Sequence, residues 1–344
     1  MNKGIIIEEQ GEKAYAYISQ FLNFEENNLD IFKTTNVFNI VKSSDKKTAI
    51  VNLNKINDIN KMNEFFKAVN NRLNEGGLFI GCVETKLERR KRLFRKYPIG
   101  FAQVYYLFDF IFKRVFSKLM LTKWLYFFVT AGRNQVLSKA EALGRLAYCG
   151  FEIVDECEID NLNYFVVKKI RAVDSVKEPR FGLLFKMTRI GKNGKPITVY
   201  KIRTMHPYAE YLQDYIYKLN NLQKGGKFSN DFRITTWGKV LRKLWIDEFP
   251  MLVNLFKGQL KLVGVRPLSE HYLSLYTDEL KEKRKKVKPG LVPPYYADLP
   301  NTLTEIIDSE LRYINAYQKN PILTDIKYFM KASTNILINK ARSK

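Results

Sequence analysis

The sequence predicts an α/β protein with two domains, and three observations lead to this fold class. Hydrophobic residues make up 46% of the 344 residues and aromatic residues 14%, which can fill a sizeable core, and this length suggests two domains more readily than one. Helix-like and strand-like apolar patterns alternate through the first half of the chain. A polar stretch at 171–180 then breaks the pattern, so we place a first domain at 1–170, a linker at 171–178 and a mixed α+β domain at 179–344.

The first domain opens with short elements. Apolar runs at Asn36–Val41 and Thr48–Val51 predict strands with polar connections. Met62–Leu73 has apolar residues at helical spacing, and Glu75–Gly77 stop that helix. Leu78–Val83 follows as a predicted buried strand.

A basic and aromatic insertion follows at about 88–132. Between Phe108 and Leu119 the apolar residues share one face of a helical wheel, and cations gather on the other. The pattern suits a helix lying in a membrane interface, where anionic lipids attract the cations, or a surface helix packed on its own domain. No run reaches the roughly 18 to 20 apolar residues that a membrane-spanning helix needs.

The first domain ends with a predicted helix and two strands. Ser138 caps the helix, which ends at Gly150, and strands are expected at Phe151–Val154 and Tyr164–Lys168. With RLNEGGLFIGCVE (residues 72–84), this stretch resembles the second half of a class I methyltransferase-like domain, which implies an incomplete Rossmann-like fold. Such domains bind a methionine-derived cofactor at a glycine-rich loop after the first strand. No such loop stands in the first sixty residues, so we expect cofactor binding to be lost.

Charge and cysteine content narrow the functional classes. The net charge is +23, of which +16 lies in residues 171–344, so the C-terminal part is expected to meet nucleic acid, acidic lipid or phosphorylated substrates. No groove-reading motif or basic and aromatic sheet pattern is found, so nucleic acid is not expected. Three cysteines without a CxxC pair or a Cys/His cluster predict a reducing compartment and no zinc site. The N-terminus lacks the pattern of a secretory signal.

The second domain begins with a predicted hairpin. Its strands are expected at Leu183–Ile190 and Pro196–Ile202, with a turn around Asn193. Guanidinium and ammonium groups at the ends of these strands suit a pyrophosphate, because arginine forks match phosphate oxygens. These cations are Arg189, Lys201 and Arg203.

An acidic pair, Asp247 and Glu248, stands between two predicted helices, Trp237–Trp245 and Phe249–Phe256. Such a pair often simply caps a helix. Here, however, seven cations lie within about twenty residues of it: Arg233, Lys239, Arg242, Lys243, Lys257, Lys261 and Arg266. We expect these cations to hold both carboxylates ionised at neutral pH, as a carboxylate nucleophile or a magnesium ligand requires.

From about Pro179 to Leu337 the chain resembles the monotopic bacterial sugar transferases, which are polyprenyl-phosphate phosphoglycosyl transferases. The resemblance rests on ordered blocks at 189–194, 201–205, 231–242, 247–258, 264–267 and 289–290. It implies transfer of a sugar-1-phosphate from a nucleotide diphosphate sugar, such as a UDP-sugar, to undecaprenyl phosphate. The reaction would occur at the cytoplasmic face of the bacterial inner membrane and start an exopolysaccharide, capsule or O-antigen.

The resemblance also implies roles for individual residues. Asp247 would attack the sugar-bearing phosphoryl group and form a phosphosugar-aspartyl intermediate. Glu248 would hold Mg²⁺ together with the pyrophosphate. The expected phosphate-binding residues are Arg189, Lys201, Arg203, Arg233, Arg242 and Arg266.

The sequence departs from the family pattern at several points. The family usually has an apolar helix, broken near its middle, that enters one leaflet just before the hairpin, and Glu152–Lys177 contains none. Membrane attachment would then fall to Phe101–Phe128, or to a peripheral mode that uses the basic surface and Tyr328–Ile338. Trp245–Ile246 replaces the usual Ser-Leu before the acidic pair. A catalytically impaired, membrane-associated scaffold is therefore the alternative function.

The sequence leaves the sugar open, because its recognition is expected to depend on loops such as 219–230 and 298–304. It also leaves open whether the chain forms a homo-oligomer.

Overall fold

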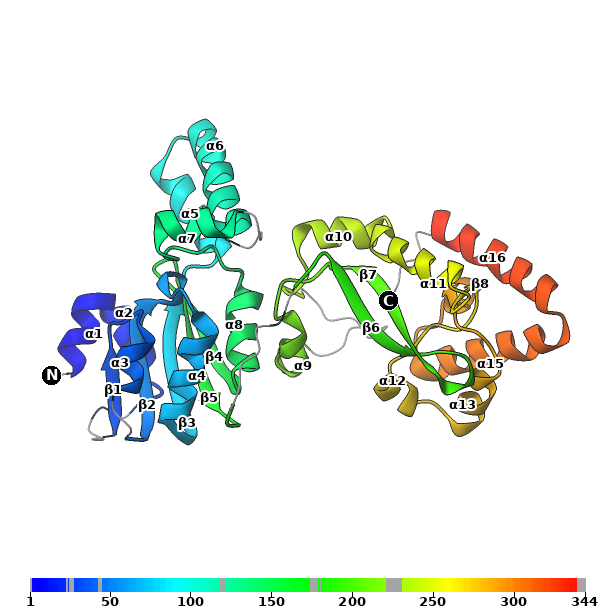
Figure 1. The fold of residues 1–344 in the computed structure, drawn as a ribbon, viewed down its shortest axis with the longest axis horizontal. Coiled ribbons are helices and arrows are strands. Elements are labelled where there is room, and N and C mark those ends of the chain that lie inside the picture. Colours follow the sequence, from blue (N-terminus) through cyan, green and yellow to red (C-terminus); the bar gives the residue numbers. More distant parts are fainter. Residues whose placement is uncertain are drawn as a thin grey trace. The chain divides into compact units, whose positions relative to one another are not determined.

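Mixed α and β structure forms both parts of the computed structural model, as the sequence predicts. The structure describes residues 2–22, 24, 28–42, 45–117, 122–173, 179, 181–220 and 231–338. It contains two compact units (Figure 1). Unit 1 comprises Met1–Pro179 with His206–Ile216, and unit 2 comprises Arg180–Met205 with Tyr217–Lys344. The predicted second domain runs unbroken from 179, whereas residues 206–216 belong to unit 1. Most of the predicted linker, 174–178, lies outside the described residues.

A five-stranded sheet forms the centre of unit 1, with strand order β1-β2-β3-β5-β4. The first three strands in this order are parallel, and β5 runs antiparallel to both of its neighbours. The bounds are β1 (Leu29–Phe32), β2 (Lys47–Lys55), β3 (Leu73–Val83), β4 (Phe151–Ile159) and β5 (Leu162–Lys169). Alternate side chains along β3 lie on opposite faces of the sheet. Phe79 packs against Phe66 on one face, and Ile80 joins the cluster around Ile18 on the other.

Helices pack on this sheet and connect its strands. The bounds are α1 (Asn2–Gln10), α2 (Glu12–Ile18), α3 (Val37–Val41), η1 (Ile56–Asp58), α4 (Met62–Arg72), α8 (Lys139–Tyr148) and η4 (Ala209–Leu212), followed by α9 (Gln213–Asn220). The predicted cap is confirmed, because the Ser138 side chain accepts a hydrogen bond from the Glu141 N–H. Gly150 adopts a φ of +87° just after this helix, a conformation that glycine adopts without steric cost.

One predicted strand is wrong, since Asn36–Val41 forms helix α3. The Asn36 side chain accepts a hydrogen bond from the Phe38 N–H at 3.0 Å, which starts a helix where the apolar run alone suggested a strand. Two N-terminal helices, α1 and α2, were not predicted either.

In its described residues the insertion of unit 1 consists of helices joined by short turns. Its elements are α5 (Lys86–Lys96), α6 (Ile99–Phe110), the π-helix η2 (Ile111–Phe116) and α7 (Lys123–Thr130). The predicted amphipathic helix at 108–119 thus spans the end of α6 and η2, and residues 118–121 lie outside the described part. Among the described residues, no helix combines the length and apolar character needed to span a bilayer.

Unit 2 begins with the predicted hairpin, β6 (Leu184–Ile190) and β7 (Pro196–Ile202), closed by η3 (Lys192–Gly194). Asn193 and Gly194 both have positive φ there, as a tight hairpin turn requires. The remaining elements are α10 (Thr236–Lys243), η5 (Ile246–Met251), α11 (Leu252–Phe256), β8 (Lys261–Val263), α12 (Glu270–Ser274), α13 (Asp278–Lys285), β9 (Gly290–Val292), α14 (Tyr295–Asp298), α15 (Leu303–Lys319) and α16 (Pro321–Leu337). The single helix predicted over Phe249–Phe256 is instead the end of η5 followed by α11.

Two close backbone approaches within unit 2 require glycine. A Cβ on Gly238 would lie 2.0 Å from the Thr204 carbonyl oxygen, so α10 packs directly on the chain that leaves β7. A Cβ on Gly290 would lie 2.1 Å from the Gly264 nitrogen, where the short parallel strands β8 and β9 meet.

Candidate active site

The acidic pair lies in the first turn of η5, and the chain on both sides fixes its position. Trp245, just before η5, has a φ of +61°, which is uncommon for a residue with a side chain. Its ring packs against Tyr296, with centroids 4.6 Å apart. Strain of this kind persists only where the surrounding structure holds it, and the aromatic contact supplies such support.

Asn254 joins the segment that carries the pair to the hairpin. Its buried side chain donates to the Thr198 carbonyl at 2.6 Å and accepts from the Tyr200 N–H at 3.3 Å. Because both partners belong to β7, the end of this strand and the acidic turn are held in one rigid framework. That framework brings Lys201, the next residue of the strand, to the acidic pair.

Asp247 is 9% exposed, and its environment raises the pKa of its carboxyl group. Burial is the largest cause, the neighbouring Glu248 carboxylate adds to it, and the positive charges of Lys201 and Arg242 oppose it. The sequence predicted that the cations would dominate and hold the group ionised. The pKa of Asp247 instead shifts upward, because the cost of desolvating this carboxylate outweighs their attraction, and its ionisation at neutral pH stays a prediction.

Glu248 differs from its neighbour, since it forms an ion pair with Lys201. The Lys201 Nζ lies 2.5 Å from Oε1 of Glu248, and both side chains are about one fifth exposed. The pair thus has an outer carboxylate with a cationic partner and an inner, desolvated carboxylate. The inner one carries the raised pKa, and therefore the greater intrinsic basicity, that a nucleophile needs.

Two predicted phosphate-binding arginines accompany the pair. Arg242 donates from Nε to the Thr204 hydroxyl at 2.9 Å, and its charge acts on Asp247. Arg266 lies over the Tyr295 ring, 5.9 Å from its centroid. Burial lowers the pKa of Arg266, but electrostatic interactions with Tyr295, Tyr296 and Glu248 raise it above its ordinary value.

The other predicted arginines lie in different surroundings. Arg189 is close enough to Arg266 that burial and mutual repulsion lower its pKa, so the two form a cationic pair. Arg203 lies over the rings of Phe181 and Phe185, about 5 Å from each centroid. Arg233 is buried and ion-paired with Asp231 at 2.8 Å, where it stabilises the turn before α10.

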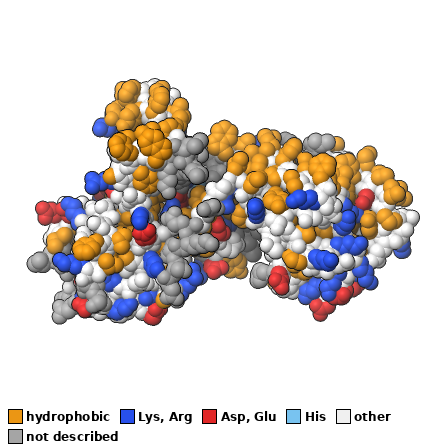
Figure 2. All heavy atoms as spheres, in the orientation of Figure 1, with side chains coloured by type: hydrophobic (Ala, Val, Ile, Leu, Met, Phe, Trp, Pro, Cys, Tyr) orange, Lys and Arg blue, Asp and Glu red, His pale blue; other side chains and the backbone are white. Residues whose placement is uncertain are grey.

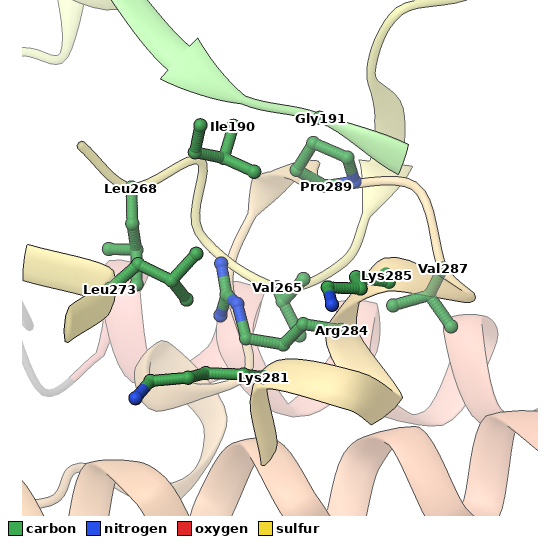
Figure 3. Close-up of a pocket in the computed structure, with 10 residues that line it drawn as sticks. All are labelled: Ile190, Gly191, Val265, Leu268, Leu273, Lys281, Arg284, Lys285, Val287 and Pro289. Carbon is green, nitrogen blue, oxygen red and sulfur yellow. The ribbon is translucent and has the colours of Figure 1, made fainter. Parts of the chain in front are cut away.

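A pocket lies beside the cationic pair (Figure 3). Residues next to Arg189 and Arg266 in sequence contribute to its wall, together with three further cations whose charged ends are paired with Asp278, Glu310 and Glu282. The lining residues are Ile190, Gly191, Val265, Leu268, Leu273, Lys281, Arg284, Lys285, Val287 and Pro289.

Several site residues were missed by sequence reasoning. Thr204, Tyr295 and Tyr296 hold Arg242, Arg266 and Trp245 in place, and they do so across 29 to 51 positions of sequence. Thr204 lies inside a recognised block, but no local pattern indicates which side chain it orients. The aromatic pair after Pro293–Pro294 was a visible signal, although nothing in the sequence linked it to the acidic turn.

An exposed apolar face borders the acidic pair on unit 2. Leu244 and Phe249, which flank the pair, are 59% and 63% exposed. Figure 2 shows hydrophobic side chains gathered along the upper edge of this unit, over α10, α11 and α16. The face comprises Trp237, Val240, Leu244, Phe249, Val253, Phe256, Ile322, Leu323, Ile326, Phe329 and Met330. A patch of this extent marks an interaction surface.

The model of a family described as bacterial sugar transferase matches residues 165–339, just over half of the chain. The chain belongs to the bacterial sugar transferase family. The matched region contains the hairpin, the acidic pair and the apolar face, and its start lies inside β5 of unit 1.

Curated relatives of this sugar transferase share the same region. It is 42% identical over 109 residues to the uncharacterized sugar transferase EpsL of Bacillus subtilis, covering 32% of the chain and 48% of the relative. It is 32% identical over 160 residues to the galactosyl transferase CpsE of Streptococcus agalactiae, and the match covers 45% of the chain and 34% of that relative. It is 31% identical over 155 residues to the undecaprenyl-phosphate galactose phosphotransferase of Salmonella typhimurium, and the match covers 43% of the chain and 32% of that relative. The chain thus spans half or less of the length of each relative.

Proposed function

We propose that this sugar transferase moves a sugar-1-phosphate from a nucleotide diphosphate sugar to undecaprenyl phosphate. The observation that carries the proposal is the desolvated Asp247 carboxylate, which lies near the positive charges of Lys201 and Arg242 and beside an exposed apolar face. Relatives named as undecaprenyl-phosphate sugar phosphotransferases support the same reaction.

In the first step an oxygen of Asp247 attacks the phosphorus that bears the sugar. The bond from this phosphorus to the oxygen of the nucleoside monophosphate breaks, and the nucleotide leaves with the electron pair. Asp247 then carries the sugar phosphate as an acyl phosphate. The cations of Lys201 and Arg242 bind the phosphoryl oxygens and stabilise the charge that develops on them.

In the second step an oxygen of the lipid phosphate attacks the same phosphorus, and the bond to Asp247 breaks. The free carboxylate is regenerated, and the product is a lipid-linked diphosphate sugar. Ping-pong kinetics follow from this order, because the nucleotide leaves before the acceptor reacts.

Magnesium is part of the proposal, with Glu248 as its protein ligand. In the described residues no cluster of three or more His, Cys, Asp or Glu side chains could hold a metal. One or two carboxylates together with substrate phosphates are, however, the usual way in which proteins bind Mg²⁺, and the pair fits this pattern. When bound, the ion supplies positive charge that neutralises the diphosphate.

The lipid acceptor is proposed to reach Asp247 from the apolar face of unit 2. Trp237 and Phe256 on this face are 78% and 87% exposed, and exposed cations such as Lys239 and Lys257 lie among them. Apolar side chains with interspersed cations suit the surface of an anionic bilayer, so we place the protein at the cytoplasmic face of the bacterial inner membrane, with a capsule or exopolysaccharide as the end product.

For the N-terminal part we propose an incomplete methyltransferase-like domain that binds no cofactor. A mostly parallel sheet with helical connections supports this assignment. The turn after β1, residues 33–36, contains no glycine and is closed by its own side chains. The Asn36 N–H donates to the Thr34 hydroxyl at 3.1 Å, and Asn39 donates to the same oxygen at 2.7 Å.

Donor hydrolysis and transfer test the transferase proposal directly. Detergent-solubilised full chain is incubated with a panel of UDP-sugars, Mg²⁺ and undecaprenyl phosphate, and UMP is measured. We expect UMP release with at least one donor, and a stoichiometric burst before the lipid is added. Asp247→Asn should lower turnover at least about a thousandfold, because the nucleophile is removed.

The control is Asp308→Asn, an exposed carboxylate on α15, which should retain full activity. Mass spectrometry of the wild-type protein with donor alone should find a sugar-phosphate adduct on the peptide that contains Asp247. Turnover retained by Asp247→Asn would contradict the nucleophile, and UMP release with none of the donors would favour the scaffold.

A further inference from the structure

The described residues of the helical insertion of unit 1, 86–117 and 122–130, expose an unusual amount of apolar surface. We call this insertion the arm. On α6 the exposed fractions reach 72% for Ile99 and 67% for Phe108, and on α7 they reach 68% for Trp124 and 83% for Phe128. Figure 2 shows hydrophobic side chains covering the tip of the arm, over α6. This region lies outside the stretch that matches the sugar transferase family.

Helix α6 is apolar on every side except one. Among its twelve residues only Ala102 and Asp109 are buried, and apart from Gly100 and the exposed Gln103 the rest of the helix offers apolar and aromatic groups to its surroundings. A helix that is hydrophobic all round normally lies in a core or in lipid. Twelve residues are too short to cross a bilayer, so an interfacial position is the one that satisfies this composition.

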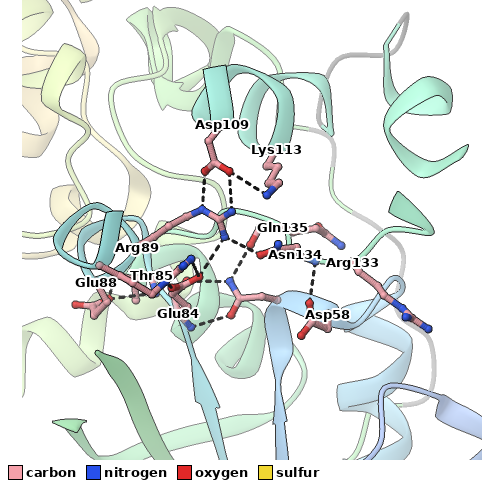
Figure 4. A network of polar contacts seen from close by, with 12 residues as sticks. Asp58, Glu84, Thr85, Glu88, Arg89, Asp109, Lys113, Arg133, Asn134 and Gln135 are labelled. Atoms are coloured by element: carbon pink, nitrogen blue, oxygen red, sulfur yellow. Dashed lines mark hydrogen bonds and ion pairs between the residues drawn. The ribbon is translucent and has the colours of Figure 1, made fainter. Parts of the chain in front are cut away.

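The arm is fixed at its base by a buried ionic network (Figure 4). Arg89 donates to Asp109 through Nε at 2.6 Å and through a terminal nitrogen at 2.8 Å, and it also contacts Glu84 at 3.1 Å. Lys113 adds a second cation, 2.9 Å from Asp109. Burial raises the pKa of Asp109, but these cations lower it below its ordinary value, so the network is ionised.

The buried network fixes the orientation of the helices of the arm, so the exposure of their apolar side chains is a defined feature of the fold. The one acidic side chain of α6 faces inward to Arg89, and the buried Tyr126 of α7 donates to the Arg133 carbonyl at 2.5 Å. The polar and buried contacts of both helices thus fix which sides face the protein. The apolar sides of α6 and α7 are left outward by a defined architecture rather than by loose packing.

The charge of the arm selects its partner. Residues 86–130 contain eleven Lys or Arg and two acidic residues, a net charge of +9. On α5, Lys91 and Arg92 are paired with Glu158 and Glu84, whereas Arg90 and Lys96 extend over the neighbouring rings of Phe94 and Tyr97. Exposed cations beside an aromatic surface complement anionic headgroups above an acyl layer.

We propose that the arm docks in the interface of an anionic lipid bilayer, with α6 and α7 among the acyl chains and the cations of α5 at the headgroups. Unit 1 then has its own membrane-binding element, separate from the apolar face of unit 2. The inference concerns a different part of the chain from the acidic pair, so it holds whether or not the proposed transfer reaction does.

The three tryptophans of the chain make a direct test possible, because Trp124 lies on the arm and Trp237 and Trp245 lie in unit 2. The full chain with Trp237→Phe and Trp245→Phe reports on the arm alone. A second chain, with Trp124→Phe and Trp245→Phe, reports on the apolar face of unit 2. Both are mixed with phosphatidylcholine vesicles that contain or lack 30% phosphatidylglycerol, and with lipids brominated at known depths.

In the anionic vesicles we expect the Trp124 emission to shift to shorter wavelength and to be quenched by brominated acyl chains. Phe101→Asp with Phe128→Asp should weaken vesicle binding by the arm at least about tenfold, because both side chains would lie in the apolar layer. Arg95→Glu with Lys96→Glu should remove about tenfold or more of the preference for anionic vesicles. The matched control is Phe38→Asp, which alters a 64% exposed phenylalanine of unit 1 outside the arm and should change neither readout.

Circular dichroism and thermal melting show that each variant folds. The proposal is overturned if Trp124 stays unquenched in vesicles to which the protein binds, or if Phe38→Asp reduces quenching as much as the arm variant does. It is also overturned if sedimentation velocity without lipid shows a dimer that the arm variant abolishes, because the apolar surface would then belong to a second copy.

Discussion

At the residue scale, the two carboxylates of the acidic turn are chemically distinct although they are neighbours in sequence. Glu248 has a lysine partner at 2.5 Å, and Asp247 has desolvation as its largest electrostatic influence. A raised pKa in a carboxylate means that the folded protein binds its proton more tightly than the unfolded chain does. Ionised Asp247 therefore lowers the stability of the fold at neutral pH, which is expected of a group placed for reaction rather than for structure.

Lys201→Met should move the acid limb of the pH–activity profile to higher pH. The Lys201 charge lowers the pKa of Asp247, so its removal lets the pKa rise further, and a larger share of the enzyme is protonated at a given acidic pH. The profile of UMP release from donor alone measures this shift. Lys195→Met, which removes an exposed cation of the hairpin, serves as the control and should leave the profile in place. An acid limb that stays fixed or moves to lower pH in Lys201→Met would contradict the assignment.

Residue identities at this site were predictable only in part. The acidic pair and the nearby cations could be found because charge and spacing are written in the sequence. The raised pKa of Asp247 could not, because it depends on how much water the folded chain removes from one oxygen. Arg203 lies over two phenylalanine rings, and Arg233 forms an ion pair with Asp231. A count of charges in the sequence reveals neither of these partners.

At the element scale, α10 depends on the absence of a side chain at one position. Gly238→Ala would place a Cβ 2.0 Å from the Thr204 carbonyl oxygen, and backbone atoms cannot yield as a flexible side chain can. We expect the free energy of unfolding to fall by about 1 to 3 kcal/mol, as overpacked sites generally show. Urea unfolding measures it.

Gly182→Ala provides the comparison, because the nearest atom to its Cβ would be 3.9 Å away. It should change the free energy of unfolding by less than about 0.5 kcal/mol. Equal stability of the two variants would show that α10 can shift away from β7.

Element boundaries followed local patterns where one local signal dominated. The strands of the hairpin and the helix capped by Ser138 form close to where they were expected, and the buried strand ends at Val83 as expected but begins at Leu73, five residues before the predicted start. The strand prediction for Asn36–Val41 was wrong because two signals competed there. The apolar run suggests a strand, whereas the asparagine caps a helix. The conformation of the turn that holds Asp247 was not predicted, because Trp245 takes a left-handed conformation there. Its contact with Tyr296, 51 positions away in sequence, supports this conformation.

At the scale of the whole molecule, the division into two units was predicted, but their membership was not. Residues 206–216 belong to unit 1, where Tyr208 receives a hydrogen bond from the Asn63 amide at 2.7 Å and stacks under Arg145. A Cβ on Gly144 would lie 2.3 Å from the Tyr208 carbonyl oxygen, so α8 is shaped to admit this segment. Contacts that join positions more than sixty apart leave no periodic trace in a sequence, which is why a contiguous boundary was expected.

The structure of unit 1 also predicts that the protein does not bind S-adenosylmethionine. A cofactor loop needs backbone N–H groups that are free to face a ligand after the first strand. Here the Thr34 N–H donates to Asn52 at 3.1 Å, and the Phe38 N–H at the start of α3 is taken by Asn36. S-adenosylmethionine should therefore give no binding heat in calorimetry with the full chain. It should also leave the melting temperature unchanged, whereas a ligand at a hundred times its Kd would add about 2.7 kcal/mol of stability. Micromolar binding would show that the turn after β1 reopens and that the domain has kept its cofactor site.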